Sequence, residues 1–135
     1  MERADVVRAA YAAFNRADVD AFCALATEDV EFHDLADMPD PQVFRGREGV
    51  ERFFTTNWDI FERAWGEVDD VLDAGPNRVL VLARHGGQAR GGSQLEQPRG
   101  VLITFSEGGK MRHVRLFADH AEGRAAAGLN EHTAA

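Results

Sequence analysis

The apolar residues of this chain repeat with one period in its first half and with another in its second half. Near the start they lie three or four residues apart, which predicts a helix of about four turns from about residue 3. The apolar face of this helix consists of Val6, Val7, Ala10, Tyr11 and Phe14.

Two more helices and one strand are predicted in the first half. Asp18 is a good N-cap for a short second helix, whose apolar face includes Phe22. A strand follows at 30–35, and the segment 36–46, with two prolines and a glycine, is predicted to be a loop. A third helix is predicted from Arg47. Its broad, aromatic-rich face consists of Val50, Phe53, Phe54, Asn57, Trp58 and Phe61.

In the second half the period changes to two, which is typical of strands. The predicted strands are 64–74, 78–92, 98–105 and 110–118, with a turn at 75–77 and a hairpin turn at 106–109. Asp119 and Glu122 have the spacing of a capping box and predict a final short helix, which Gly128 would end.

This order of elements predicts an α+β fold: a curved, mostly antiparallel sheet that forms a cone-like half barrel, with helices packed on its concave face. Gly86, Gly87, Gly91 and Gly92 in the second long strand favour bulges and strong curvature. A curved sheet covered by helices on its concave side tends to leave a pocket. No linker or repeat divides the chain, so residues 1–135 are expected to form one domain with a core at about 3–129.

Charge and composition disfavour several classes of partner. The 135 residues carry a formal net charge of -8 without any basic run, which argues against nucleic acid and against an anionic membrane surface. No apolar run approaches the roughly 18 residues of a membrane span. With the single cysteine Cys23 no internal disulfide can form, and we expect a reducing, cytoplasmic location.

The strand at 30–35 places an acidic residue on its apolar face. Side chains alternate along a strand, so Val30, Phe32 and Asp34 point the same way. A carboxylate at the wall of an apolar pocket is disfavoured as an ion, which suits a base that abstracts a proton next to a carbonyl. The alternative is that Asp34 pairs with an arginine or caps the loop that follows.

Arg84 is the expected partner of Asp34. If Leu80 and Leu82 face the pocket, alternation places Arg84 on the same side, and a buried arginine needs a counter-charge. The pair would either hold a carboxylate or carbonyl group of a substrate or serve as a structural ion pair.

The five histidines predict no metal site. His33, His85, His113, His120 and His132 are dispersed and show no spacing typical of metal ligands, so we predict neither metal nor cofactor. His33 should meet a neighbouring strand or helix on the face opposite Asp34, and His113 should lie on the outer surface of the sheet.

Four segments together resemble the nuclear transport factor 2-like superfamily and, within it, the SnoaL-like group. They are "VVRAAYAAFNRADVDAFCALATEDVEFHD", "FRGREGVERFF", "RVLVLARHGGQARG" and "GGKMRHVRLFADHAEGRAAAGL". The resemblance implies a cone-shaped α+β barrel with a mostly apolar cavity, often a homodimer packed through the sheet. Members include steroid isomerases, polyketide cyclases, epoxide hydrolases, dehydratases and non-enzymatic binders, so the fold does not select a function.

The resemblance to ketosteroid isomerases assigns roles to some positions. In those enzymes the catalytic base lies five residues after the aspartate that precedes the same strand. Here that aspartate is Asp29, and the residue five positions later is Asp34. Their oxyanion tyrosine falls on Ala10, with Tyr11 one position away, and their protonated aspartate falls on Val101. The aspartate on the last strand of the cyclases falls on Leu116. These departures indicate that the chain is neither a ketosteroid isomerase nor an aldol-type cyclase.

Two functions remain open from the sequence. The first is a cofactor-independent isomerase, dehydratase or hydrolase for a small apolar substrate, with Asp34 as base and Arg84 stabilising charge. The second is a non-catalytic ligand-binding or dimerisation module in which this pair is structural. In either case a small apolar ligand would contact Phe14, Phe32, Phe54, Asn57, Trp58, Val101 and Leu116. A homodimer is expected through an apolar outer sheet face formed by Val79, Val81 and Ala83.

Overall fold

The fold consists of four helices and six strands in the described part of the chain. The computed structural model describes residues 2–35 and 42–129. In chain order the elements are α1 (Arg3–Asn15), α2 (Val19–Ala24), β1 (Ala26–His33), β2 (Val43–Arg45), α3 (Gly46–Ile60), β3 (Phe61–Asp73), β4 (Arg78–Ala89), β5 (Gln94–Phe105), β6 (Met111–Phe117) and α4 (His120–Ala127).

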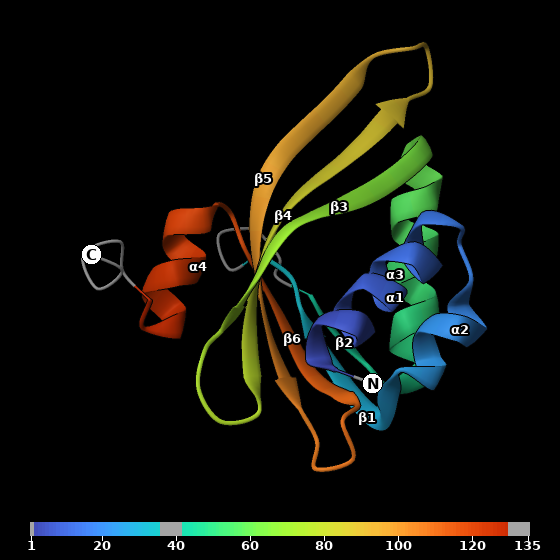
Figure 1. Ribbon diagram of the computed structural model, residues 1–135. Coiled ribbons are helices and arrows are strands. Elements are labelled where there is room, and N and C mark those ends of the chain that lie inside the picture. The colour runs from blue at the N-terminus through green and yellow to red at the C-terminus, as the bar shows by residue number, and fades with distance from the viewer. Residues whose placement is uncertain (1, 36–41, 130–135) are drawn as a thin grey trace.

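The strands form one curved sheet in the order β2-β1-β6-β5-β4-β3. Neighbouring strands run antiparallel except β1 and β6, which are parallel and join the first half of the chain to the last strand. Figure 1 shows α1, α2 and α3 on one side of this sheet and α4 on the other. The predicted α+β class with a curved, mostly antiparallel sheet is confirmed.

The main core lies between the sheet and the first three helices. Val7 and Ala10 of α1 are buried with Val81 of β4 in one apolar cluster. This burial removes Val6, Val7 and Ala10 of the predicted apolar stripe from water, at roughly 25 cal/mol per Å² of apolar surface. The helix therefore forms where the spacing of its apolar residues predicts.

Helix α4 covers the opposite face of the sheet, so the helices do not all lie on the concave side. Leu80 and Leu82 of β4 pack with Ala127 of α4 in a second apolar cluster. A Cβ atom at Gly123 of α4 would lie 3.1 Å from the Cα of Gly100 in β5, so glycine permits the close approach of helix and strand.

The orientation of β4 corrects one prediction. Val79, Val81 and Ala83 are buried in the main core, and the face we expected to be outermost is the inner one. Because both faces of this part of β4 are covered, residues 79–83 are all buried, and their alternation cannot be read from polarity. These three residues therefore provide no dimer surface.

The local signals are otherwise close to the observed boundaries. The side chain of Asp18 accepts a hydrogen bond from the N–H of Ala21, as predicted for the N-cap of α2. Strands β1 and β5 each begin four residues before the strands predicted at 30 and 98, and β2 lies inside the predicted loop 36–46. Phe61, predicted on the third helix, is the first residue of β3, and Gly91 and Gly92, predicted in a strand, follow the end of β4 at Ala89. Residues 36–41 of that loop lie outside the described residues.

Candidate functional site

A mostly apolar cavity of about 380 Å³ lies between the inner face of the sheet and the helices α1 and α3. Phe32 of β1 and Phe53 of α3 form part of its aromatic wall, with ring centroids 5.0 Å apart. A cavity of this size suits a small molecule. The polar or ionisable side chains that line it are those of Tyr11, Asp34, Thr56, Asn57, His85, Gln97 and Arg99.

Most of the ligand-contacting residues expected from the sequence line this cavity. They are Phe14, Phe32, Asn57, Val101 and Leu116. Ala10, the position that matches the oxyanion tyrosine of the isomerases, also lies in the wall.

Phe54 and Trp58 lie behind the cavity wall. Phe54 is buried, with its ring 5.2 Å from that of Phe14, and Trp58 packs against Phe14 from 6.4 Å. The α3 residues that line the cavity are Phe53, Thr56 and Asn57. Phe53 and Asn57 lie one position before Phe54 and Trp58 along the helix, which is a rotation of about 100°. The aromatic face predicted for this helix therefore packs against the protein interior, but of its residues within α3 only Phe53 and Asn57, on one side of that face, line the cavity.

A tyrosine and a histidine form a hydrogen-bonded pair in the wall of the cavity. The hydroxyl oxygen of Tyr11 lies 2.6 Å from Nε2 of His85. Gly66 pairs with His85 across β3 and β4, and a Cβ atom there would lie 2.5 Å from the ring of Tyr11. Asn15 at the end of α1 exchanges two hydrogen bonds with the backbone of Gly66, which holds the helix against β3 at this point.

Both members of this pair are neutral near pH 7. Burial lowers the pKa of His85 to about 4, and the positive charge of Arg99 adds to the effect. Burial also raises the pKa of Tyr11 well above its ordinary value. The pair can therefore offer or accept a hydrogen bond but carries no charge of its own.

Arg99 of β5 supplies the positive charge of the cavity wall. Its guanidinium donates to the carbonyl oxygens of Pro98 and Ala118 and to Oε1 of Gln97. Among residues 2–35 and 42–129, no carboxylate lies within salt-bridge distance of it. The charge of Arg99 is therefore available to an electron-rich group of a ligand.

Asp34 lines the same cavity, as strand alternation predicts. Its carboxylate accepts a hydrogen bond of 2.8 Å from the N–H of Leu35, and its own N–H donates to the carbonyl oxygen of Gln42. The backbone thus holds the residue at the end of β1, next to the start of β2.

Arg84 does not pair with Asp34. Its guanidinium binds Glu67, Asp69 and Glu96, and its side chain is 40% exposed. Nearby carboxylates, with Asp69 first, raise the pKa of Arg84. The reason is the orientation of β4: because Val79, Val81 and Ala83 face inward, Arg84 faces outward. Arg84 is therefore removed from the candidate site.

Sequence reasoning missed His85, Arg99 and Trp65 as cavity residues. One signal could have found His85, since it continues the alternation of Val81 and Ala83. The alternation alone does not place His85 in the cavity, because residues 79–83 are apolar on both faces and the sequence does not show which face of β4 is inward. Tyr11 lies one position after Ala10, the residue that matches the tyrosine of the isomerases, and both residues line the cavity.

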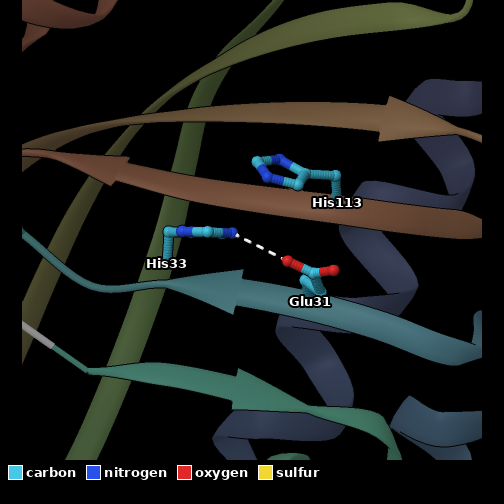
Figure 2. Close-up of side chains that lie close together, drawn as sticks. All are labelled: Glu31, His33 and His113. Carbon is cyan, nitrogen blue, oxygen red and sulfur yellow. Dashed lines mark hydrogen bonds and ion pairs between the residues drawn. The ribbon is translucent and has the colours of Figure 1, made fainter.

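The outer face of the sheet carries a second polar cluster. Glu31 and His33 of β1 and His113 of β6 bring one potential ligand atom each to within 4.8 Å of one another (Figure 2). As predicted, His33 meets a neighbouring strand and His113 lies on the outer face, since Val114 beside it lines the cavity.

The cone-like sheet, the three helices that cover its inner face and the apolar cavity between them define a nuclear transport factor 2-like protein. The family model of the SnoaL-like domain matches residues 7–114, and the chain belongs to this family. No curated protein matches the chain at a significant level. None of the described helices is long and apolar enough to cross a membrane.

Solved structures with the same fold are distant in sequence. TerC, crystallised with polyporic acid, is 16% identical, with a TM-score of 0.77 over 93% of this chain and 98% of TerC. RV0760c from Mycobacterium tuberculosis, in complex with estradiol-17beta-hemisuccinate, is 17% identical, with a TM-score of 0.73 over 84% of this chain and 91% of its own. A protein of ketosteroid isomerase-like fold from Catenulispora acidiphila, in complex with trimethylamine, is 18% identical, with a TM-score of 0.73 over 92% of both chains. At these identities the likeness concerns the fold.

Proposed function

We propose that this protein binds a small, mainly apolar molecule with one carbonyl group and transfers a proton on it, as a cofactor-independent isomerase. The observation that carries the proposal is that a carboxylate, Asp34, and a neutral hydrogen-bonding pair, Tyr11 and His85, line one apolar cavity. Base and donor are the two groups that proton transfer next to a carbonyl requires.

The proposed chemistry needs no external reactant. The carboxylate of Asp34 takes a proton from the carbon next to the carbonyl group. The electron pair of that C–H bond forms a carbon–carbon double bond, and the π electrons of the carbonyl group move to its oxygen. The resulting enolate accepts a hydrogen bond from Tyr11 and is stabilised by the charge of Arg99. In a ligand with a carbon–carbon double bond between the β and γ carbons, the enolate is a dienolate. Asp34 then returns the proton to the γ carbon, the double bond shifts next to the carbonyl group, and the isomerisation is complete.

The tautomer of His85 decides what Tyr11 offers to the ligand. If Nε2 of His85 carries the proton, it donates to the tyrosine oxygen, and the tyrosine O–H is then free to donate into the cavity. We assign this tautomer to the ligand-bound protein. In the opposite tautomer the tyrosine O–H donates to Nε2 of His85 and is not available to the ligand.

Binding of the same class of ligand without chemistry is the second candidate. One observation favours it: the carboxylate of Asp34 already accepts a hydrogen bond from Leu35, as a residue that only stabilises a turn would do. The two candidates share the cavity and differ in whether Asp34 moves a proton.

Binding is tested first, by competition of small alicyclic and aromatic ketones with a fluorescent dye that binds apolar cavities. Arg99→Gln should weaken binding of the ketones that compete, because it removes the charge in the wall. Arg84→Gln is the matched control, since it removes an arginine from the adjacent strand on the other face. Equal affinities of the two variants and the wild type would refute the role of Arg99, and failure of every ketone to compete would refute the proposed ligand class.

Proton transfer is tested separately with the ketones that bind. In D₂O, the wild-type protein should speed the exchange of protons next to the carbonyl, measured by NMR, and Asp34→Asn should abolish the acceleration while retaining binding. Tyr11→Phe should reduce the rate by about 10²-fold or more, as for removal of one oxyanion donor. Binding without accelerated exchange would support the second candidate.

A homodimer formed through the outer face of the sheet remains a proposal. Its support is the resemblance to a superfamily whose members often pair in this way, since the apolar residues first assigned to the interface are buried in the core. Light scattering that gives the mass of a monomer at micromolar concentration would refute it.

A further inference from the structure

The cluster of Glu31, His33 and His113 lies on the face of the sheet opposite the cavity. Glu31 and His33 flank Phe32, whose side chain points into the cavity, so their own side chains point away from it. His113 is the register partner of Glu31 across the parallel pair β1 and β6. Figure 2 shows the three side chains rising from these two strands toward one another.

The positions of the ligand atoms suit a small cation. Nε2 of His33 lies 3.1 Å from Oε1 of Glu31, and the rings of His33 and His113 have centroids 4.5 Å apart. Ligand atoms of a tetrahedral zinc ion lie about 3.4 Å from one another, given bonds of about 2.0–2.2 Å. The atoms of the cluster lie within 4.8 Å of one another, and both imidazoles are partly exposed, so only a small side-chain rotation would be needed to reach that distance.

The type of donor selects the class of metal. Two imidazole nitrogens and one carboxylate oxygen are the ligands of many zinc sites that leave a fourth position to water. Imidazole favours zinc, copper, nickel or iron, whereas magnesium and calcium favour oxygen ligands alone.

Neighbouring arginines have two opposite effects on a metal site here: one helps to orient Glu31, and their positive charges disfavour a cation. The second oxygen of Glu31 lies 3.8 Å from Nε of Arg45, which leaves Oε1 for the metal. Arg45 and Arg115 add positive charge nearby, and Arg115 is the register partner of His33. Without a metal, the Glu31–His33 contact is an ordinary surface pair, and exposed pairs of this kind contribute little to stability.

We propose that Glu31, His33 and His113 bind one zinc-class divalent ion on the outer face of the sheet, with at least one coordination position open to water. The site joins β1 to β6, which is the contact between the first half of the chain and its last strand. It is independent of the proposed isomerase site in the cavity.

The test is a zinc titration of protein without an affinity tag, in competition with a colorimetric chelator. The wild type should bind one equivalent of Zn²⁺ with a Kd of about 10 μM or tighter. His33→Ala and His113→Ala should each weaken binding by about tenfold or more, since even loss of a group that supports a metal ligand has an effect of that size. His132→Ala, which removes a histidine outside the described residues, is the control and should bind as the wild type does. Mg²⁺ should not compete.

Thermal unfolding provides the second measurement. Zinc at about 100 times its Kd should raise the Tm of the wild type by about 5–10 °C and leave that of His33→Ala unchanged. Both histidines are partly exposed, so the variants should fold without metal, which their melts in chelator will show. Failure of the wild type to bind zinc below about 100 μM, or undiminished binding by both variants, would overturn the proposal.

Discussion

The histidine in the cavity wall should make the stability of the protein sensitive to mild acid. In the folded protein burial holds the pKa of His85 at about 4, and its ordinary value is 6.5. Between these values the unfolded chain binds a proton that the folded protein does not. The free energy of unfolding therefore rises with pH across this window and falls as the pH drops from about 6.5 toward 4.

The size of the effect follows from the two pKa values. Their difference of about 2.5 corresponds to about 3.4 kcal/mol once both states are fully protonated. Between about pH 7 and pH 5 the part that is lost is about 2 kcal/mol, because the folded protein is still almost unprotonated at His85.

Urea unfolding of the wild type and of His85→Gln, at several pH values, isolates this contribution. Carboxylates titrate in both proteins and cancel in the difference. Loss of the contact with Tyr11 adds a constant offset, because Tyr11 stays protonated throughout. The stability advantage of the wild type should shrink by about 2 kcal/mol from about pH 7 to pH 5. A difference independent of pH would mean that His85 is protonated as readily in the folded protein as in the unfolded chain.

Three further changes test the packing and the local contacts. Gly66→Ala places a Cβ atom 2.5 Å from the Tyr11 ring and should lower the free energy of unfolding by about 1–3 kcal/mol, measured in urea. Asp119→Ala removes the acceptor for the N–H of Glu122 at the start of α4 and should cost about 1 kcal/mol in the same assay. Asp34→Asn should leave the Tm almost unchanged, because an asparagine oxygen can still accept the hydrogen bond from Leu35.

The first two changes have a control variant, and each of the three has an outcome that would contradict it. Gly108→Ala meets no atom closer than 3.8 Å and should be tolerated, so equal stability of the Gly66 and Gly108 variants would mean that Tyr11 yields freely. Asp119→Asn keeps an acceptor, and a loss as large as that of Asp119→Ala would exclude capping as the cause. A loss of several kcal/mol in Asp34→Asn would instead indicate a buried charge pair, and none involves Asp34 among residues 2–35 and 42–129.

The sequence by itself determined those features that depend on residues close together in the chain. The α1 stripe and the N-caps Asp18 and Asp119 depend on residues within one or two turns of one another, so their spacing is enough to predict them. The inward direction of Asp34 follows in the same way, because Val30 and Phe32 define the buried face of a strand whose other face is polar.

Tertiary packing decided the composition of the site. In β4, residues 79–83 are apolar on both faces because α1 covers one and α4 the other, so polarity does not distinguish inside from outside. The choice of face exchanges Arg84 for His85 in the cavity, and a shift by one residue always has this effect in a strand. The partners of each polar group come from distant segments: Tyr11 and His85 are 74 residues apart in sequence, and only the folded sheet brings them to 2.6 Å.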